Sequence, residues 1–147
     1  MELLFGTNVR EHNQRAGRLA GFEVDSATQR VHKVIFSGDG ELGNHAVTRP
    51  FSSVRADSGA IEIQPYTPAE DGAPPTAVLL SHSTRIVRAG REVGRVTGLD
   101  VDLQTGMLEA AIGRKSWLSR RFALPASSID LSVPGEVRTG APTSRAA

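Results

Sequence analysis

The 147-residue chain contains no cysteine, so it can form no disulfide framework, no thiolate metal site and no cysteine nucleophile. It also lacks any run of about 18 consecutive apolar residues, the length that would predict a membrane-spanning helix. Its first residues, MELLFGTNVREH, have neither the basic start nor the long apolar core of a signal peptide. We therefore expect a cytoplasmic protein that does not insert into membranes.

An excess of charge of one sign is also missing, because 17 basic residues face 16 acidic ones and the formal net charge is +1. That balance argues against a protein whose whole surface binds a polyanion. The charges are nevertheless distributed unevenly. Residues 1–64 hold 7 basic and 8 acidic residues, whereas residues 77–133 hold 8 basic and 5 acidic ones. The second half of the chain is therefore the basic one.

An internal repeat is the main feature that the sequence does contain. GRLAGFEVDSAT at residues 17–28 returns 77 positions later as GRVTGLDVDLQT at residues 94–105. After a two-residue contraction the offset becomes 75, and PFSSV at 50–54 matches PASSI at 125–129. Each copy spans about 60 residues, which is near the lower size limit for a domain with its own apolar core. Two small units are therefore expected rather than one large core.

The boundaries of these units follow from composition. We predict a first repeat over residues 1–64 and a second repeat over residues 77–138. Between them, PYTPAEDGAPPT at residues 65–76 holds four of the eight prolines and almost no apolar side chain, which predicts an extended, semi-rigid linker. The second repeat is expected to end with a short strand at 136–138, and residues 139–147 are predicted to be a flexible tail.

Alternation of apolar and acidic residues predicts strands and excludes a long helical stripe. Phe-Glu-Val-Asp at 22–25 and Leu-Asp-Val-Asp at 99–102 are each followed by a turn and by a second alternating run, so both repeats are expected to form antiparallel hairpins. The PFSSV and PASSI segments each open with a proline, which favours a single 3₁₀ turn. The fold class predicted is all-β.

Eight recurring residues are predicted to shape turns and bends of the backbone. An Asp and the Thr three residues after it can close the turn of each hairpin through bonds to nearby amides. The glycine four residues before that Asp lies where the apolar residues change parity, which predicts a bulge or sharp bend. The glycine that opens each motif is expected to supply a positive φ in a polar turn. The eight residues are Gly17, Gly21, Asp25, Thr28, Gly94, Gly98, Asp102 and Thr105.

The order Gly-Arg, two residues, Gly, three residues, Asp, two residues, Thr, followed by an alternating strand and by Pro-[Phe/Ala]-Ser-Ser-[Val/Ile], resembles the PRC-barrel domain family. That family includes the cytoplasmic domain of the photosynthetic reaction-centre H subunit and a domain of a bacterial ribosome-maturation factor. The resemblance covers residues 3–64 and 80–133. It implies two tandem, small antiparallel β-barrels joined by the Pro-rich linker, and it brings no catalytic residue with it.

No other pattern predicts catalysis, a cofactor or a metal site. Histidines 12, 32, 45 and 82 have no metal-ligand spacing, and neighbours on a strand such as those of Ser-His-Ser at 81–83 point to opposite faces. Asp100 and Asp102 share a strand face, so an acid–base pair is geometrically possible. The first repeat has Glu and Asp at the same positions, and a solvated strand face explains both copies better. We expect no catalytic residue, no cofactor and no bound metal.

One segment, GRKSWLSRR at residues 113–121, combines four basic residues with the only tryptophan of the chain. This composition is typical of phosphate contact with base stacking and of protein hot spots. The plainer interpretation is a charged hairpin tip whose tryptophan lies across the end of the barrel as a core residue, and contact with an anionic surface is a further alternative. The candidate partner-binding residues are Arg114, Lys115, Trp117, Arg120 and Arg121.

The equivalent loop of the first repeat is acidic, with Asp39 and Glu41. A contact between repeats, within or between chains, could use this opposite charge, and a homodimer is a reasonable expectation. Together the patterns predict a non-enzymatic adaptor or assembly factor that binds a protein partner. The alternative is a ribosome- or RNA-associated maturation factor that uses the basic loop at 114–121.

Overall fold

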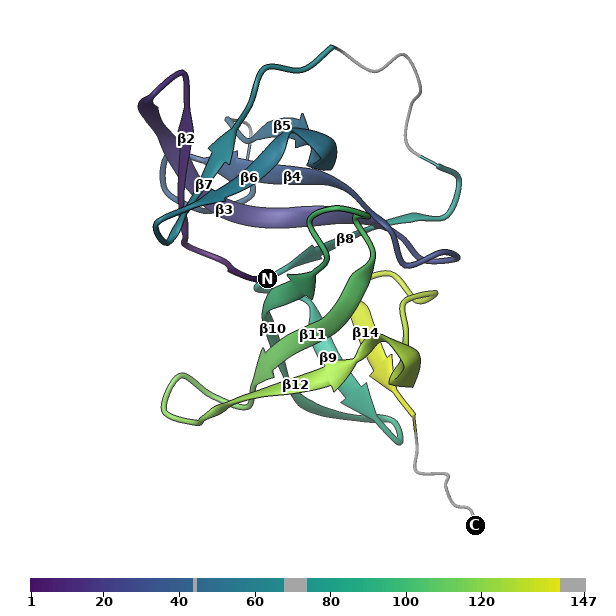
Figure 1. The fold of residues 1–147 in the computed structure, drawn as a ribbon. Coiled ribbons are helices and arrows are strands. Elements are labelled where there is room, and N and C mark those ends of the chain that lie inside the picture. The colour runs from purple at the N-terminus through teal and green to yellow at the C-terminus, as the bar shows by residue number, and fades with distance from the viewer. Residues whose placement is uncertain (44, 68–73, 141–147) are drawn as a thin grey trace.

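The computed structural model describes residues 1–43, 45–67 and 74–140, which form an all-β fold of two seven-stranded sheets (Figure 1). The predicted fold class is therefore confirmed. The first sheet consists, in spatial order, of β5 (Val47–Pro50), β4 (Val31–Ser37), β3 (Gln14–Asp25), β2 (Asn8–Glu11), β7 (Ala60–Ile63) and β6 (Val54–Asp57), with β8 (Ala77–Ser81) paired to β3.

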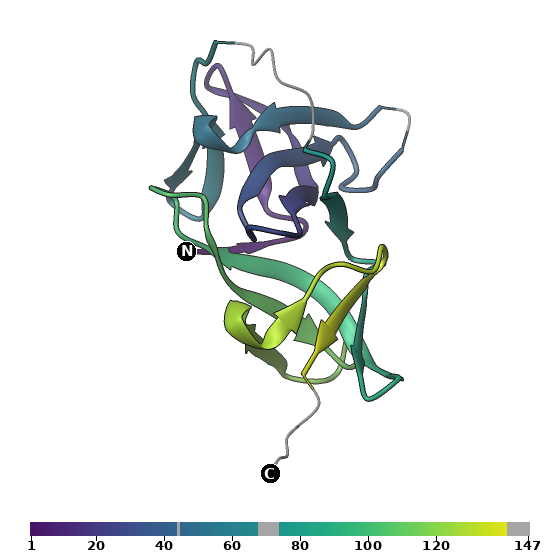
Figure 2. The same cartoon turned by 90° about the vertical axis from the view of Figure 1, so that its right-hand side faces the viewer.

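The second sheet repeats this arrangement with strands of the second repeat, and Figure 2 shows the two sheets one above the other. Its strands, in spatial order, are β12 (Arg121–Pro125), β11 (Leu108–Arg114), β10 (Arg91–Val101), β9 (Arg85–Arg88), β14 (Glu136–Thr139) and β13 (Ile129–Asp130), with β1 (Glu2–Leu4) paired to β10.

Several local predictions are confirmed. The alternating segments form the antiparallel hairpins β3–β4 and β10–β11. The two proline segments form the 3₁₀ turns η1 (Phe51–Ser53) and η2 (Ala126–Ser128), each held by a serine hydroxyl that donates to the preceding proline carbonyl. The expected final strand is β14, which runs through Thr139, one residue into the range predicted as tail. Residues 68–73 of the predicted linker and 141–147 of the predicted tail lie outside the described residues.

The sheets differ from purely antiparallel barrels in two ways. β7 pairs with β2 in parallel, as β14 does with β9, so both sheets are of mixed orientation. Neither sheet closes into a barrel: the ends of the first, β5 and β6, and of the second, β12 and β13, share no ladder in the described part of the chain. These ends are joined instead by η1 and η2, where a proline without an N–H and the 3₁₀ turn interrupt strand pairing.

The two repeats exchange their first strands. β1 of the first repeat pairs with β10 of the second, which places Leu3 opposite Leu99. β8 of the second repeat pairs with β3 of the first, which places Leu80 opposite Phe22. Leu3 and Leu80 are equivalent positions of the repeat, and both are buried. Each repeat therefore completes the sheet of the other, so the division at residues 64 and 77 describes the sequence repeat but not the sheets.

An approximate two-fold relation between the repeats passes through the tips of the two hairpins. Arg30 and Met107, which are equivalent positions, form a bridge with each other. On either side, Val31 N donates to Gly106 O at 2.8 Å and Leu108 N donates to Gln29 O at 2.9 Å. Val31 is equivalent to Leu108, and Gln29 is equivalent to Gly106, so each repeat donates the same bond to the other. The two repeats therefore face each other across this point.

The apolar core is shared, which corrects the expectation of two separate cores. Buried side chains of both repeats belong to one continuous cluster. The exchanged strands explain this continuity, because Leu3 contributes to the second sheet and Leu80 to the first. Phe5, on the segment that leaves β1, packs against Phe22 of the first sheet with ring centroids 5.7 Å apart.

The recurring glycines lie inside strands β3 and β10 rather than in turns, which corrects the placement of Gly17 and Gly94. Gly17 has the expected positive φ, 153°, but Gly94 does not. What the two share is a close neighbour: a Cβ would lie 2.4 Å from Ser37 O at Gly17 and 2.8 Å from Arg114 O at Gly94. Both positions therefore need glycine because a neighbouring backbone carbonyl approaches closely.

The second glycine pair stands at the expected face change. The register of β3 shifts between Leu19 and Gly21, and that of β10 shifts between Val96 and Gly98. A bulge at this point bends each long strand just where the exchanged strand of the other repeat begins to pair with it.

Candidate partner-binding surface

The hairpin of β11 and β12 projects from the second sheet, at the left-hand side of Figure 1. Arg114 and Arg121 face each other at the end of its ladder. Beyond them the chain turns tightly: Ser119 N donates to Ser116 O at 3.0 Å, and the two serine hydroxyls lie 3.0 Å apart. Arg114 Nη1 also donates to Trp117 O at 3.3 Å. The tip is thus held by local polar contacts.

The tip of this hairpin is apolar and open to solvent. Trp117 is 81% exposed and the neighbouring Leu118 is 78% exposed. The interpretation of Trp117 as a core residue across the barrel end is therefore wrong. Single exposed apolar residues are common, but a Trp and a Leu together at the end of a projecting hairpin form a contact surface that water solvates poorly.

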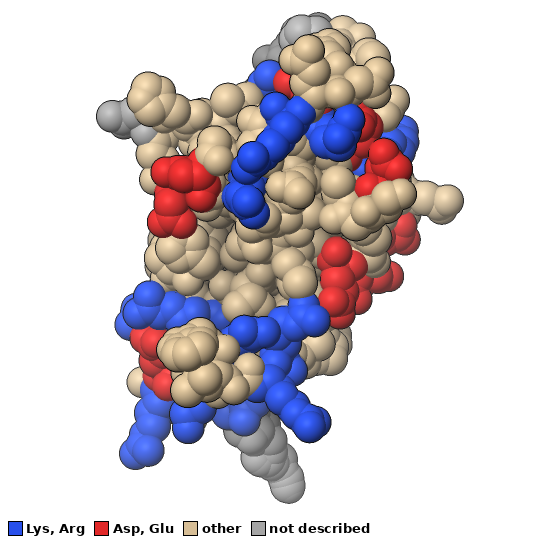
Figure 3. All heavy atoms as spheres, turned by 90° about the vertical axis from the view of Figure 1, so that its left-hand side faces the viewer, with Lys and Arg blue, Asp and Glu red and all other residues tan. Residues whose placement is uncertain are grey.

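Basic side chains surround the base of this tip. Lys115 and Arg120 are exposed and form no ion pair within the described residues. Arg121 Nη1 lies 3.7 Å from Glu2 Oε1, a contact between exposed groups that adds little stability. In Figure 3, which faces this side of the molecule, blue spheres gather over the lower half, which is formed by the second sheet.

The pairing register extends this basic surface across the sheet. Arg121 is opposite Arg114, Arg114 is opposite Arg95, and Arg95 is opposite Arg85. These four residues, which we call the arginine row, therefore run across β12, β11, β10 and β9. Like charges that face each other across strands destabilise a sheet, so the row costs some stability unless counter-charges compensate it.

Three members of the arginine row have such a counter-charge. Arg85 pairs with Glu136, Arg95 pairs with Glu92 at 3.3 Å, and Arg121 approaches Glu2. Arg114 has none within 4 Å among the described residues, and its buried Nε has no hydrogen-bond partner there. The row is therefore less attractive to a polyanion than the number of its cations suggests.

All five predicted partner-binding residues thus lie on one hairpin, but sequence reasoning missed three residues of the same surface. Leu118 is neither basic nor aromatic, so the composition that marks its neighbours does not mark it. Arg85 and Arg95 are distant in sequence, and only the strand register brings them alongside Arg114. The Gly-Arg of the repeat motif, which contains Arg95, was the one signal available.

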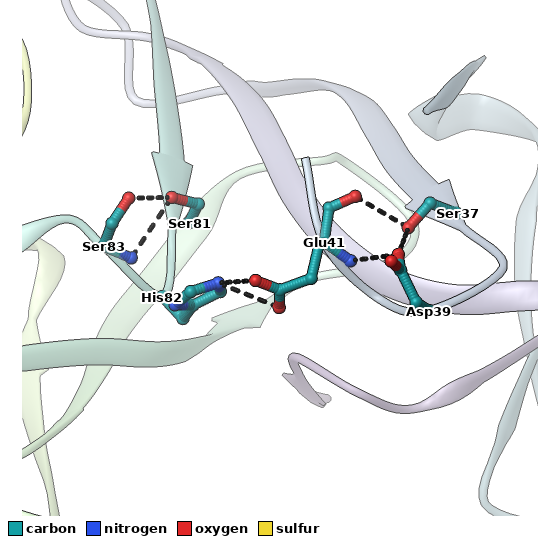
Figure 4. Close-up of polar contacts among 6 residues, drawn as sticks. All are labelled: Ser37, Asp39, Glu41, Ser81, His82 and Ser83. Carbon is teal, nitrogen blue, oxygen red and sulfur yellow. Dashed lines mark hydrogen bonds and ion pairs between the residues drawn. The ribbon is translucent and has the colours of Figure 1, made fainter. Parts of the chain in front are cut away.

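Among the described residues, no hydrogen bond or ion pair joins the acidic loop of the first repeat to the basic hairpin. The acidic loop closes on itself, because Asp39 Oδ1 accepts bonds from Ser37 Oγ and Glu41 N, both at 3.0 Å (Figure 4). The bond from the Glu41 amide, followed by that from Ser37, lowers the pKa of Asp39. Glu41 then reaches His82 in the turn after β8, with His82 Nε2 3.1 Å from Glu41 Oε2. The acidic loop of the first repeat thus contacts the second repeat through the hydrogen bond between Glu41 and His82, not through the basic hairpin.

The side chains weighed for catalysis are engaged elsewhere. His82 points to Glu41 while Ser81 and Ser83 contact each other at 2.9 Å (Figure 4). Asp102 accepts a bond from Gln104 N at 2.9 Å, whereas Asp100 accepts one from the amino group of Met1 at 2.8 Å. The two carboxylates therefore serve different structural contacts.

The Asp and Thr residues of the repeat motif hold the hairpin turns in the same way in both copies. Asp25 Oδ1 accepts a bond from Ala27 N at 2.9 Å, matching the contact of Asp102. Thr28 Oγ1 and Thr105 Oγ1 each accept a bond from the amide two residues further on. Asp25 is also bonded by Thr76 Oγ1 at 2.5 Å, which is the main cause of its lowered pKa.

Among the residues that the structure describes, no helix has the length and apolarity needed to span a bilayer. Comparison of the chain with protein-family models and with curated proteins yielded no match to either.

Proposed function

We propose that the chain is a non-enzymatic adaptor or assembly factor, built from two PRC-barrel-like repeats, that binds an acidic protein partner through the β11–β12 hairpin. The observation that carries this proposal is the exposed pair Trp117 and Leu118 at the tip of a projecting hairpin. Tryptophan and arginine are the residues most enriched among those that dominate protein interfaces.

The arrangement of charge favours a protein over a nucleic acid. An apolar centre with a basic rim matches the anatomy of a protein interface, and the partner should therefore offer an apolar pocket with carboxylates around it. A tip that stacks on bases would use flat aromatic faces, and Leu118 offers none. Counter-charges on three members of the arginine row reduce the attraction for phosphates.

The PRC-barrel assignment has support of its own. In each sheet the two end strands follow each other in sequence and are joined by a 3₁₀ turn after a proline, at the position where the family-like motif places Pro-[Phe/Ala]-Ser-Ser-[Val/Ile]. In the two family members that the sequence resembles, the domain engages other proteins. An adaptor role is consistent with both precedents.

The test is affinity purification of the tagged chain from its native cell, with mass spectrometry, in parallel with the double variant Trp117→Ala/Leu118→Ser. We expect one partner, recovered reproducibly by the wild type, to be lost by the variant, since a hot-spot residue contributes about 2 kcal/mol or more to binding. The matched control is Leu42→Ser, which changes an exposed apolar residue in the equivalent loop of the first repeat. Undiminished recovery by the double variant would contradict the proposal.

The RNA-associated alternative rests on the arginine row and on Lys115 and Arg120, and it makes a different prediction. RNA retention would fall steeply as the salt concentration rises. Each cation that is neutralised would reduce the slope of log affinity against log salt concentration by about one. Lys115→Gln and Arg120→Gln are suitable variants because both side chains are exposed. Partner binding that survives 0.5 M salt but not the Trp117 variant would exclude this alternative.

A further inference from the structure

A pocket lies between the two repeats, away from the hairpin. It has a volume of about 310 Å³. The first repeat contributes the start of β4 and the turn η1, and the second repeat contributes the turn between β10 and β11, which reaches up to the first sheet in Figure 1. The pocket exists because the two repeats face each other, and it shares no residue with the partner-binding surface.

The pocket is cationic. Arg30 and Lys33 line it beside the imidazole of His32, and no carboxylate does. Within the described part of the chain, none of these three side chains takes part in an ion pair. Glu23 is opposite Lys33 in the strand register but forms no ion pair with it. Arg30 and Lys33 therefore repel each other at the hollow, and an anion between them would remove that repulsion.

The rest of the lining suits a polar body attached to the anion. Ser52, Gln104 and Thr105 provide hydroxyl and amide groups, while Phe51 and Leu103 provide apolar walls. A volume of this size lies at the lower end of the range for small-molecule sites. It is large enough for a phosphorylated metabolite and too small for a folded partner.

The two-fold relation supplies an internal comparison. The position equivalent to Gly106 is Gln29, whose Nε2 donates to Ala126 O at 3.0 Å and to Ile129 O at 3.3 Å. In the second repeat, η2 is thus capped by a glutamine side chain from the opposite hairpin. At Gly106 no such side chain exists, so η1 has no glutamine cap, and the ring of Phe51 forms a wall beside the pocket there instead.

The charge of the lining also differs between the two sides. Arg30 and Lys33 correspond to Met107 and Ala110, so only the pocket side carries these two cations. Phe51 corresponds to the smaller Ala126, so at this position the pocket side has the larger residue. The pocket therefore differs from its pseudo-symmetric counterpart in its charge and in the missing glutamine cap, and an anionic ligand fits this difference.

We propose that this junction pocket binds a small phosphate monoester that carries hydroxyl groups, of the sugar-phosphate class. Arg30 and Lys33 contact the phosphate, whose two negative charges match two permanent cations. Ser52, Gln104 and Thr105 exchange hydrogen bonds with the hydroxyl groups. The proposal goes beyond the adaptor function and does not depend on it.

The experiment is calorimetric titration of the full chain with ribose 5-phosphate, with ribose and inorganic phosphate as matched probes. We expect saturable binding of ribose 5-phosphate, weaker binding of phosphate and none of ribose. The double variant Arg30→Gln/Lys33→Gln should weaken binding about tenfold or more, because two charge-assisted contacts are lost. Arg15→Gln/Arg91→Gln serves as a control that changes the net charge equally at exposed sites outside the pocket.

A second variant tests the pocket by shape. Gly106→Gln copies the opposite side, where Gln29 already occupies the left-handed region with a φ of 61°, close to the 77° of Gly106. A Cβ at Gly106 would lie 3.4 Å from its nearest neighbour, Val31 O, so the backbone leaves room for it. We expect this variant to abolish binding, and Gln29→Gly to leave it unchanged.

The proposal would be overturned by no heat change with ribose 5-phosphate at millimolar concentration, by equal binding of ribose, or by wild-type affinity in Arg30→Gln/Lys33→Gln. Equal affinity for inorganic phosphate would overturn the assignment of a monoester. Should Gly106→Gln fail to fold, the charge variants, which change partly exposed side chains, still decide the outcome.

Discussion

Glu11 and Arg49 form a bidentate ion pair that spans the curled first sheet. Arg49 Nε donates to Glu11 Oε2 at 2.8 Å and Nη2 donates to Oε1 at 3.1 Å. Both side chains are partly buried, and the guanidinium also lies over the rings of Phe36 and Tyr66 at 5.7 and 5.9 Å. Since β2 and β5 are not neighbours in the sheet, the pair ties together strands that backbone bonds leave apart.

The hydrogen bonds from Arg49 hold the pKa of Glu11 below its ordinary value. A carboxyl whose pKa is lowered in the folded state stabilises the protein above its unfolded pKa, about 4.3, and loses that contribution as pH falls through the folded pKa. We therefore expect Glu11→Gln to lower the free energy of unfolding by about 1–2 kcal/mol at pH 7, between exposed and fully buried ion pairs. The difference from wild type should shrink below about pH 4.

Urea unfolding of both proteins at pH 7, 5 and 3 measures this effect. Glu92→Gln is the control, because its partner Arg95 and Glu92 itself are both more exposed, and it should change stability by less than about 1 kcal/mol. An equal difference between Glu11→Gln and wild type at pH 3 and pH 7 would show that the pair does not act through the charge of Glu11.

At the scale of the element, the sequence predicted the hairpins well because alternation and turn residues are local signals. Asp25 and Thr28 could be assigned to a turn from their spacing alone. Gly21 and Gly98 could be assigned to a bend, because the apolar parity changes there. The sequence alone did not explain why the bend needs a glycine, because the close neighbour there is a strand from the other repeat.

The candidate partner-binding surface also contains residues that local sequence predicted and residues that it did not. Arg114 and Trp117 stand close together in sequence and were found. Arg85 and Arg95 belong to the same surface only through strand register, and register depends on bulges and turns that composition does not reveal. Gly106 was overlooked as well, because the meaning of a glycine there appears only when it is compared with Gln29 in space.

Gly98 gives a test of the strand exchange. A Cβ at Gly98 would lie 2.4 Å from Leu3 O and 2.8 Å from Leu4 Cα, both atoms of the exchanged strand β1. At the equivalent Gly21 the nearest atom, Leu80 O, is 3.0 Å away. We therefore expect Gly98→Ala to destabilise the protein by about 2–3 kcal/mol and Gly21→Ala by about 1 kcal/mol, as backbone clashes inside packed structure cost.

Denaturant unfolding of the two variants measures these losses, and amide exchange locates them. The Val101 amide, which donates to Met1 O, should exchange faster in Gly98→Ala than in Gly21→Ala if β1 is displaced. Equal destabilisation by the two substitutions would argue that β1 does not approach Gly98 as closely as β8 approaches Gly21.

For the whole molecule, the duplication was visible in sequence but the exchange of strands was not. Leu3 and Leu80 are buried in equivalent places, and they would be buried equally if each repeat kept its own first strand. The pattern of apolar residues is therefore the same for both arrangements. The two arrangements differ in the direction that the chain takes at residues 81–84, where it makes a tight turn. Thr84 N donates to Ser81 O and Ser81 N donates to Thr84 Oγ1, so β8 and β9 point in different directions.

This exchange predicts the behaviour of one repeat alone. A fragment of residues 74–140 retains β8 but lacks β1, so the slot on β10 beside Gly98 is empty while β8 has lost its partner β3. Because β1 and β8 are equivalent, two fragments can satisfy each other by placing β8 of each on β10 of the other, the usual low-cost route to a swapped dimer. We therefore expect the fragment to be a homodimer.

Size-exclusion chromatography with light scattering measures the mass of the fragment. Leu80→Ser in the same fragment is the control, because it removes the side chain that would fill the place of Leu3, and it should shift the mass toward that of one copy. A fragment that is monomeric and as stable as the full chain would mean that β8 returns to its own β10. The two repeats would then be self-sufficient units, and the shared core would follow from their linkage rather than from the exchange.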